Sequence, residues 1–387
     1  MLRSLFSGIS GLRAHQQMMD VTGNNIANVN TTGYKSSQAV FQDTLSQMLA
    51  AAGAPQNQAG GTNPAQVGLG VRMASINGNF SQGAAQVTGK SSDMMIQGDG
   101  FFVVRADGEE LFTRAGSFTF DANGTLTTPN GQVVQGWTAT NGVVNSAGAP
   151  ADIVLPIGIS LAPVATTEIT LTGNFSYEAL PGDIKEIPIK VIDTNGAAQS
   201  MVATFTKVDA DTWQMDLPDG STANIDFNAD GTAALASQTV GGYTFDTAAL
   251  TNFSGLTEAR VSNSNGSGAG VLSTYTVSNT GQIVGVFSNG LKETLGQIAL
   301  ANFNNVNGLE KIGDSMFRST VNSGLAQIGA AGTAGFGMVT SGALEMSNVD
   351  LAQEFTNLVI AQRGFQANSR ILTTSDEILQ ELVNLKR

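Results

Sequence analysis

Residues 351–387 read LAQEFTNLVIAQRGFQANSRILTTSDEILQELVNLKR, and this stretch decides the fold. Apolar side chains recur in heptads, which predicts a helix with one narrow seam, the pattern of a coiled-coil strand. The seam residues are Leu351, Phe355, Leu358, Phe365, Leu372, Leu379 and Val383. Asp350 with Gln353 predicts an N-terminal capping box. Gly364 lies inside the helix, where a glycine costs ~1 kcal/mol relative to alanine.

The start of the chain carries a second seam of the same kind, on a helix predicted from about residue 4 to residue 26. Its residues are Leu5, Ile9, Leu12, Met19 and Ile26. The middle of the chain has no helical pattern that would complete a bundle, so each seam needs a partner from this chain or from another copy. Residues 1–30 and 350–387 therefore form a predicted terminal helical core domain. Two ordinary amphipathic helices in one core remain an alternative.

Composition limits the possible functions of this chain. Its 387 residues suffice for two or three domains, and charged residues make up only 13% of them. A formal net charge of -13 with no basic cluster argues against nucleic acid as a partner. The absence of cysteine excludes disulfides and thiolate metal sites. No apolar run approaches the ~20 residues of a membrane span, so no membrane insertion is expected.

The segment after the first helix is expected to be irregular. Residues 24–35 read NNIANVNTTGYK, and this asparagine cluster predicts turns, because asparagine tolerates left-handed backbone and bonds its own main chain. Residues 31–70 are interpreted as a connecting segment. Within it, residues 38–52 regain helical character, and residues 53–63 form a mobile linker rich in Gly, Gln and Ala.

The middle of the chain has the period of β structure. Short β-type runs alternate with turn signals such as Asn123-Gly124 and Asn195-Gly196, the strongest short-range hairpin signal. We predict an inner β domain at residues 71–148 and 266–349 and an outer β domain at residues 149–265. The fold class is therefore multidomain, with α-helical coiled-coil termini and two mainly antiparallel β domains nested in the chain.

No constellation of residues points to catalysis, a cofactor or a metal. His15 is the only histidine and lies among polar residues, so a solvated surface side chain is expected. Two turns that begin at Asp121 and Asn228 resemble the start of a calcium loop but lack its later glutamate, and β-turns explain both. The protein is predicted not to be an enzyme, with no catalytic, cofactor-binding or metal-binding residues.

Several ordered motifs resemble the bacterial flagellar rod and hook protein family. They are SGISGL at residues 7–12, NNIANVNTTGYK at 24–35, IQGDGFFV at 96–103, GALEMSNVDL at 342–351 and AQRGFQAN at 361–368. The matches cover both ends and the first β domain, roughly half of the chain. The residues carried over from the N-terminal motif are Asn24, Asn25, Ala27, Asn28, Thr32, Gly33 and Tyr34.

The resemblance implies a structural subunit that polymerises into a helical tube, with the terminal helices innermost and the β domains outside. The extra middle domain favours a hook-type subunit, the flexible universal joint between rod and filament. The implied partners are other copies of the chain, the distal rod protein, the hook cap, the hook–filament junction protein and the flagellar type III export apparatus. The implied location is extracellular, in the flagellar hook and basal body, after export without a cleaved signal peptide.

Two alternatives remain open at this point. A distal rod subunit belongs to the same family and is shorter. A secreted β-sandwich adhesin is an alternative of another class, but it would need an aromatic platform, and Trp137 and Trp213 are isolated in the sequence.

Overall fold

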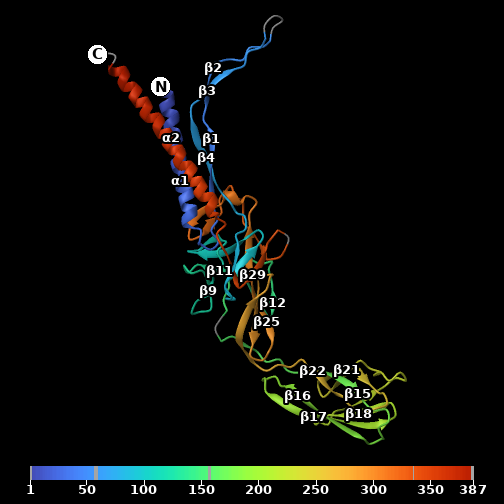
Figure 1. Cartoon of the computed structure of the whole chain (residues 1–387). Helices are drawn as coiled ribbons and strands as arrows, with labels where there is room; N and C mark the ends of the chain where they lie inside the picture. The colour runs from blue at the N-terminus through green and yellow to red at the C-terminus, as the bar shows by residue number, and fades with distance from the viewer. Residues whose placement is uncertain (1, 56–59, 156–157, 334, 385–387) are drawn as a thin grey trace. The chain divides into compact units, whose positions relative to one another are not determined.

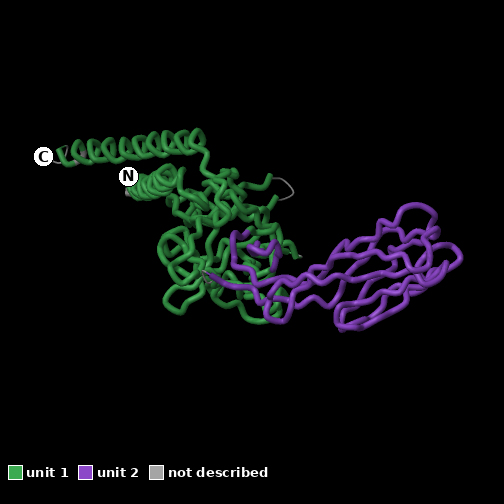
Figure 2. The backbone as a smooth tube through the Cα atoms, turned by 90° about the horizontal axis from the view of Figure 1, so that it is seen from below, with its two compact units in different colours: residues 1–155, 276–283, 294–387 green, residues 156–275, 284–293 purple. Residues whose placement is uncertain are grey.

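The computed structural model describes residues 2–55, 60–155, 158–333 and 335–384. Over these residues the chain is mostly β structure, with one long helix at each end (Figure 1). The chain forms two compact units (Figure 2). Unit 1 comprises residues 1–155, 276–283 and 294–387, and unit 2 comprises residues 156–275 and 284–293. The chain therefore enters unit 2 twice, at residues 156–275 and 284–293, and ends in unit 1.

The two terminal helices predicted from the heptads are confirmed. Helix α1 spans Leu2–Ala27 and helix α2 spans Leu351–Asn384, and the two lie side by side in unit 1 (Figure 1). The carboxylate of Asp350 accepts hydrogen bonds from the backbone N–H groups of Ala352 at 2.9 Å and Gln353 at 3.3 Å, which confirms the N-cap half of the predicted capping box. The Gln353 amide donates to the Asn357 side chain at 3.3 Å instead of completing the box. No helix among the described residues has the length and apolar character to cross a membrane.

A two-stranded antiparallel ribbon follows α1. Strand β1 (Ser37–Asp43) pairs with β4 (Val71–Gly78), and strand β2 (Ser46–Ala50) pairs with β3 (Ala65–Gly68). Every residue of β2 and β3 is exposed. Neither pair joins a larger sheet among the described residues.

The helical character expected over residues 38–52 is wrong. Half-buried Ala39 and Phe41 alternate with exposed Gln38 and Val40 along the first part of β1, as in a strand. Short apolar runs fit either period, and the pairing with β4 supplies hydrogen bonds that the local pattern does not encode. Strand β4, at the start of the predicted inner β domain, pairs with β1 in this ribbon.

The linker expected at residues 53–63 is partly paired. Gly53 and Thr62 exchange two backbone hydrogen bonds of 3.0 and 3.1 Å. Residues 56–59 lie outside the described residues. The pairing of Gly53 with Thr62 therefore extends the ribbon beyond β2 and β3.

Unit 1 contains a mainly antiparallel sheet in which β25, β11, β7, β8, β27 and β26 are neighbours in this order. The strands of the first part of the unit are β5 Ala85–Val87, β6 Met94–Gln97, β7 Phe101–Ala106, β8 Glu109–Thr113, β9 Thr119–Phe120, β10 Leu126–Thr127, β11 Val133–Thr140, β12 Val143–Val144 and β13 Ala151–Asp152. Those of the last part are β26 Glu310–Gly313, β27 Met316–Arg318, β28 Gln327–Ala330, β29 Met338–Ser341 and β30 Ala343–Glu345, with a short 3₁₀ helix at Val306–Gly308.

The core of unit 1 is a cluster of phenylalanines. Phe101 packs edge-on against Phe303 and Phe317, with ring centroids 6.0 and 5.6 Å apart. Phe80, just after the ribbon, joins the cluster at 5.5 Å from Phe317. Edge-to-face pairs of this kind contribute roughly 0.5–1.5 kcal/mol each beyond their buried area. The ribbon is therefore anchored to the sheet at its base.

Unit 2 contains two four-stranded sheets, β20-β21-β15-β22 and β16-β17-β18-β19, that share one apolar core. All pairs are antiparallel except β15 with β21, which is parallel. The strands are β14 Ser160–Leu161, β15 Glu168–Asn174, β16 Ile184–Ile192, β17 Ala198–Asp209, β18 Thr212–Asp216, β19 Thr222–Asp226, β20 Ser237–Val240, β21 Tyr243–Thr251 and β22 Arg260–Ser264. Strands β23 Gly270–Val277, β24 Gln282–Phe287 and β25 Lys292–Asn302 each have residues in both units.

The predicted Asn-Gly turns are confirmed where they join strands. Gly131 connects β10 to β11 with φ +87°, and Gly196 connects β16 to β17 with φ +83°. These left-handed conformations favour glycine, which has no Cβ to clash with the backbone. Local sequence therefore determined these hairpins.

The core of unit 2 gives the first testable prediction. Phe175 is fully buried, with its ring centroid 4.8 Å from that of Trp213 and 5.2 Å from that of Phe205. Phe175→Ala should lower the stability of unit 2 by about 3–5 kcal/mol through the cavity it leaves. Hydrogen exchange should then show faster exchange in β16–β18 and unchanged exchange in β7 and β8.

The matched control is Val143→Ala, a truncation at an exposed position in unit 1. It should change stability by less than about 0.5 kcal/mol. Equal loss of protection in β7 and β8 upon Phe175→Ala would show that the two units do not unfold separately.

Candidate functional site

Small residues form the contact between α1 and α2. Gly8 and Gly11 face α2, and Gly364 faces α1, while Ala14 and Ala361 on the same helices are buried. A Cβ atom added at Gly11 would lie 2.8 Å from the side-chain amide of Asn368, and one at Gly364 would lie 2.4 Å from the ring of His15. The two backbones therefore approach more closely than larger side chains would allow.

His15 is not the solvated side chain that the sequence suggested. Its ring lies over Gly364, and its centroid is 6.2 Å from the ring of Phe41 on β1. The Nδ1 atom is buried and has no hydrogen-bond partner among the described residues. Gly364, read from the sequence only as a helix-weakening residue, provides the space for this ring. The spacing of three between Gly8, Gly11 and Ala14 was the signal that could have identified this contact.

The predicted seam residues divide between the helix contact and the surface. Those that are half-buried are Leu5, Leu12, Met19, Ile26, Leu358, Phe365, Leu372 and Leu379. Those that are exposed are Ile9, Leu351, Phe355 and Val383. The residues spaced strictly seven apart from Leu5 and from Leu358 are half-buried, whereas Ile9, Phe355 and Val383 on the other position of the heptad are exposed. The structure thus brings only part of the seam together within one chain.

A second apolar flank of α2 is missing from the heptad pattern. Ile360, Ile371 and Ile378 are 54%, 43% and 50% exposed. Their spacings of eleven and seven residues place them within about 20° of one another around the helix. Ile371 borders the contact with α1, since its Cγ2 atom would lie 3.6 Å from a Cβ added at Gly8, so the flank is partly covered by α1 and otherwise exposed.

Asn25 fixes the end of α1 to the structure that follows. Its side chain is 1% exposed and accepts hydrogen bonds from Ser37 N at 3.0 Å and the Tyr34 hydroxyl at 3.2 Å. It donates to Ser37 O at 2.8 Å and to the Glu354 carboxylate of α2 at 3.1 Å. One side chain therefore ties α1, β1 and α2 together with every hydrogen bond it can form.

The turn-rich character predicted for residues 24–35 is confirmed over residues 28–33, whereas residues 24–27 continue α1. The Asn28 amide donates to the backbone and side-chain oxygens of Asn24 at 2.9 and 3.0 Å, and its own oxygen accepts from the Thr31 hydroxyl at 3.0 Å. Ala27 is the last residue of α1 and is exposed, and Thr32 is half-buried in the turn.

Gly33 and Tyr34 bring the chain from the turn onto the sheet. Gly33 has φ +68°, and an added Cβ would lie 2.4 Å from the backbone nitrogen of Ala115, so no other residue fits there. The ring of Tyr34 lies under the ammonium group of Lys311, 5.1 Å away. Burial and then the charge of Glu354 raise the pKa of the Tyr34 hydroxyl.

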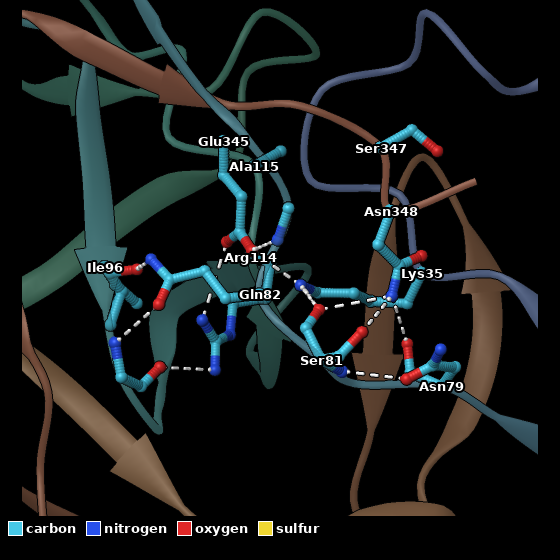
Figure 3. A network of polar contacts seen from close by, with 12 residues as sticks. Lys35, Asn79, Ser81, Gln82, Ile96, Arg114, Ala115, Glu345, Ser347 and Asn348 are labelled. Carbon is cyan, nitrogen blue, oxygen red and sulfur yellow. Dashed lines mark hydrogen bonds and ion pairs between the residues drawn. The ribbon is translucent and has the colours of Figure 1, made fainter. Parts of the chain in front are cut away.

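A buried ion pair follows the motif (Figure 3). The Lys35 ammonium lies 2.6 Å from the carboxylate of Glu345, and both side chains have no exposed surface. Arg114 approaches the same carboxylate at 3.5 Å and donates to Gly98 O at 2.9 Å. Burial lowers the pKa of Lys35, and its hydrogen bond to Glu345 opposes that shift. Loss of one partner from such a pair typically costs about 3–5 kcal/mol.

Asn348 extends this network toward α2. Its carbonyl oxygen accepts the Ser36 N–H at 2.9 Å, and its amide donates to Asn79 O at 2.7 Å and Ser81 O at 3.1 Å (Figure 3). Residues from the N-terminal motif, the base of the ribbon and the C-terminal motif therefore meet at one place, hereafter the junction. Sequence reasoning missed the junction because its members are far apart along the chain.

The described residues offer no metal centre, because no group of three or more His, Cys, Asp or Glu could hold an ion among them. The Asp121 carboxylate instead accepts the backbone N–H groups of Asn123 and Thr125 within its own turn. The Asp230 carboxylate accepts the backbone N–H and hydroxyl of Thr232. The arrangement as a whole holds helices and strands together rather than presenting reactive groups.

Three parts of the chain match known families. Residues 5–35 match "Flagella basal body rod protein", residues 95–177 match "Flagellar hook protein FlgE/F/G D1 domain", and residues 340–385 match "Flagellar basal body rod FlgEFG protein C-terminal". The two terminal matches contain the motif residues and both helices.

Similar proteins cover the whole chain. The flagellar hook protein FlgE of Borreliella burgdorferi is 38% identical over 445 residues, with all of both chains covered. The flagellar basal-body rod protein FlgG of Bacillus subtilis is 33% identical over 388 residues, again with both chains covered. The crystal structure of the Helicobacter pylori hook protein FlgE2 resembles 67% of this chain and all of its own, with a TM-score of 0.52 at 14% identity, which shows the fold alone.

The glycines of the two helices give a matched pair of substitutions. Gly364→Ala should weaken the α1–α2 contact by about 1–3 kcal/mol, because the new methyl group meets the His15 ring. Gly23→Ala on α1, where an added Cβ meets nothing within 4 Å, should stabilise the helix by up to ~1 kcal/mol. Thermal unfolding followed by far-ultraviolet circular dichroism measures both effects.

The double variant His15→Ala with Gly364→Ala is the internal control. Removing the ring should restore most of the stability lost upon Gly364→Ala. If Gly364→Ala stabilises the protein as much as Gly23→Ala does, the close contact is not important for the helix pair.

Proposed function

We propose, because the chain belongs to the flagellar hook protein family, that its terminal helices and its ribbon carry the contacts by which its copies assemble. The protein is a structural subunit and not an enzyme. It polymerises into the bacterial flagellar hook, the flexible universal joint that couples rod to filament. It forms part of the flagellum, outside the cell membrane.

The observation that carries the proposal is the unburied apolar flank of α2. Ile360, Ile371 and Ile378 expose about half of their surface on one side of a long helix. A contiguous apolar surface on a folded protein marks a place where another molecule packs. In a homopolymer the natural occupant of such a surface is a neighbouring copy.

The ribbon supports the same proposal. Leu45, Met48 and Leu49 are 82%, 58% and 59% exposed along its outer part. An isolated two-stranded ribbon is marginally stable at best in water, because it has little apolar surface to bury. Packing against neighbouring copies would supply the burial that the ribbon lacks within one chain.

The predicted seam residues serve two contacts, one within the chain and one proposed between copies. Its half-buried residues hold α1 to α2, whereas Leu351, Phe355 and Val383 are exposed and available to other copies. We propose that the helices form a coiled-coil core with neighbouring subunits and that this core becomes fully ordered only on assembly. Inter-subunit burial would then offset the conformational entropy lost when the helices order.

The finer organisation is proposed on the same basis. Residues 1–30 and 350–387 would form the inner core, residues 71–148 and 266–349 the inner β domain, and residues 149–265 the outer β domain. The division of the chain into two compact units supports a nested outer domain. The distal rod protein, the hook cap, the hook–filament junction protein and the type III export apparatus are the proposed partners, with export that leaves the N-terminus uncleaved.

The two alternative functions are not favoured. Identity to the hook relative exceeds identity to the rod relative, and its alignment is longer. A glycan-binding adhesin would use exposed aromatic rings, yet Trp137 and Trp213 are buried in the two units.

A charge on the apolar flank tests the proposed contact. Ile378→Asp should abolish assembly, because an unpaired carboxylate would be buried against a neighbouring helix. Gln366→Asp, on an exposed polar position of the same helix, should leave assembly unchanged. Electron microscopy of hooks from complemented cells measures the outcome, and circular dichroism of the purified variants shows whether they remain folded. Normal hooks from Ile378→Asp would contradict the proposal.

Ordering on assembly makes a separate prediction. In dilute monomer the backbone amides of residues 358–379 should exchange with solvent within seconds to minutes, and in the assembled fibre they should be protected by several orders of magnitude. Hydrogen-exchange mass spectrometry compares the two states, with β7 and β8 as the internal control that is protected in both. Protection of residues 358–379 in the monomer would show that the helices are ordered before assembly.

A further inference from the structure

The N-terminal side of the junction depends on the C-terminal side. The Lys35 ammonium contacts the Glu345 carboxylate at 2.6 Å (Figure 3). The Gly33 N–H donates to Glu345 O at 2.7 Å, and the Ser36 N–H donates to Asn348 at 2.9 Å. Three successive anchors of residues 33–36 therefore end on residues 345–348. Without the C-terminal segment the N-terminal segment would lose all three. It would keep the bonds of the Lys35 ammonium to Ser81 O, of the Lys311 ammonium to Lys35 O and of the Asn79 N–H to Ser36 O.

The C-terminal side does not show the same dependence. Strand β30 pairs with β5 over Ala343 to Glu345, and the Met346 N–H continues the pairing by donating to Ala84 O at 2.9 Å. Strand β29 pairs with β6 in the same manner. None of these bonds involves residues 33–36, so strands β5 and β6 hold the C-terminal segment in place.

Charge makes the asymmetry stronger. The Glu345 carboxylate also accepts the Gly83 N–H at 2.9 Å and lies 3.5 Å from Arg114, so it keeps a donor and a cation when Lys35 is absent. Lys35 keeps one acceptor, Ser81 O at 2.8 Å, but gains no anion in place of Glu345, because Arg114 beside it carries the same sign. Two buried cations without an anion between them repel each other and lack compensation for their lost hydration.

We propose that Glu345 is the positioning residue of the N-terminal motif and that the junction closes in a fixed order, residues 343–348 first and residues 33–36 second. Helix α1 would then be placed only after the base of α2 is docked on unit 1. The ends of the chain would order in sequence instead of independently, so an N-terminal segment would dock less stably in the absence of its own C-terminal segment.

Single-cysteine probes test this order in the full-length chain, which contains no natural cysteine. Ser36→Cys places a thiol in the N-terminal segment, and Ala343→Cys places one in β30; both positions are buried. The rate of thiol labelling reports how often each segment opens. Each probe is combined with Glu345→Gln and with Lys35→Met, and labelled in dilute solution and in the assembled fibre.

We expect Glu345→Gln to affect the probe at position 36 and Lys35→Met to leave the probe at position 343 nearly unchanged. Glu345→Gln should speed labelling at position 36 by at least about tenfold, whereas Lys35→Met should change labelling at position 343 by less than about twofold. Equal acceleration at position 343 in Lys35→Met would overturn the order of closure. Unchanged labelling at position 36 in Glu345→Gln, or fast labelling there in the otherwise unaltered fibre, would overturn the positioning role.

Conservative variants separate charge from packing. Glu345→Asp keeps the negative charge but is one methylene shorter, whereas Glu345→Gln keeps the size but loses the charge. A positioning role through charge predicts slower labelling at position 36 in the aspartate variant than in the glutamine variant, and a packing role predicts the reverse. A reversed ranking would overturn the proposal.

Two further variants guard against trivial loss of structure. Trp137 is buried in unit 1, and its fluorescence shows whether Glu345→Gln keeps the inner sheet folded. If it does not, Asn348→Ala removes the acceptor of the Ser36 N–H without changing charge and should give the same one-sided result; no effect at position 36 would overturn the proposal. Asp152→Asn, in the exposed pair with Arg105, is the control and should affect neither probe.

The readouts in dilute solution do not depend on assembly. Labelling in dilute solution and in fibres is compared within each variant, so a failure of the proposed inter-subunit contacts at Ile378 would leave the test of the junction intact.

Discussion

The buried contact between Lys35 and Glu345 is the constraint on which the rest of unit 1 depends. Both side chains are fully buried, and the residues beside them bond the base of the ribbon and the start of α2. Charged groups are rarely buried unless their partners and geometry are fixed, because the cost of removing them from water is high. The pair therefore specifies one way for the N-terminal and C-terminal segments to meet. Helix α1 ends shortly before Lys35, and helix α2 begins shortly after Glu345.

The helix pair built on this junction uses little apolar side chain for its own contact. Gly8, Gly11 and Gly364 let the backbones approach, and His15 occupies the space above Gly364. Close approach through small residues gives many dispersion contacts but buries few large side chains. Most of the large apolar residues of the helices are consequently half-buried or exposed, as Ile378 illustrates. A subunit that must pack with its own copies gains from this division of surfaces.

The sequence predicted what local patterns encode. The heptads indicated both helices, Asp350 indicated the cap of α2, and Asn-Gly pairs such as Asn195-Gly196 indicated hairpins, because each is decided within a few residues. The strands over residues 38–52 were missed because their partners, β4 for β1 and β3 for β2, lie later in the chain. The junction could not be predicted for the same reason: Lys35 and Glu345 are more than 300 residues apart, and nothing local marks either as buried.

The two kinds of contact suit the two tasks of a subunit in a flexible joint. Hydrogen bonds and ion pairs at the junction are directional, and a shift of an ångström would leave Glu345 without its partners. Apolar contact is non-directional and changes little when two surfaces slide by a fraction of a side chain. The outward surfaces of α2 and the ribbon are apolar or uncharged at Ile371 and Leu49, where neighbours are proposed to pack. Movement between copies therefore disturbs contacts that tolerate it, while the connection between helices and β structure within each copy remains fixed.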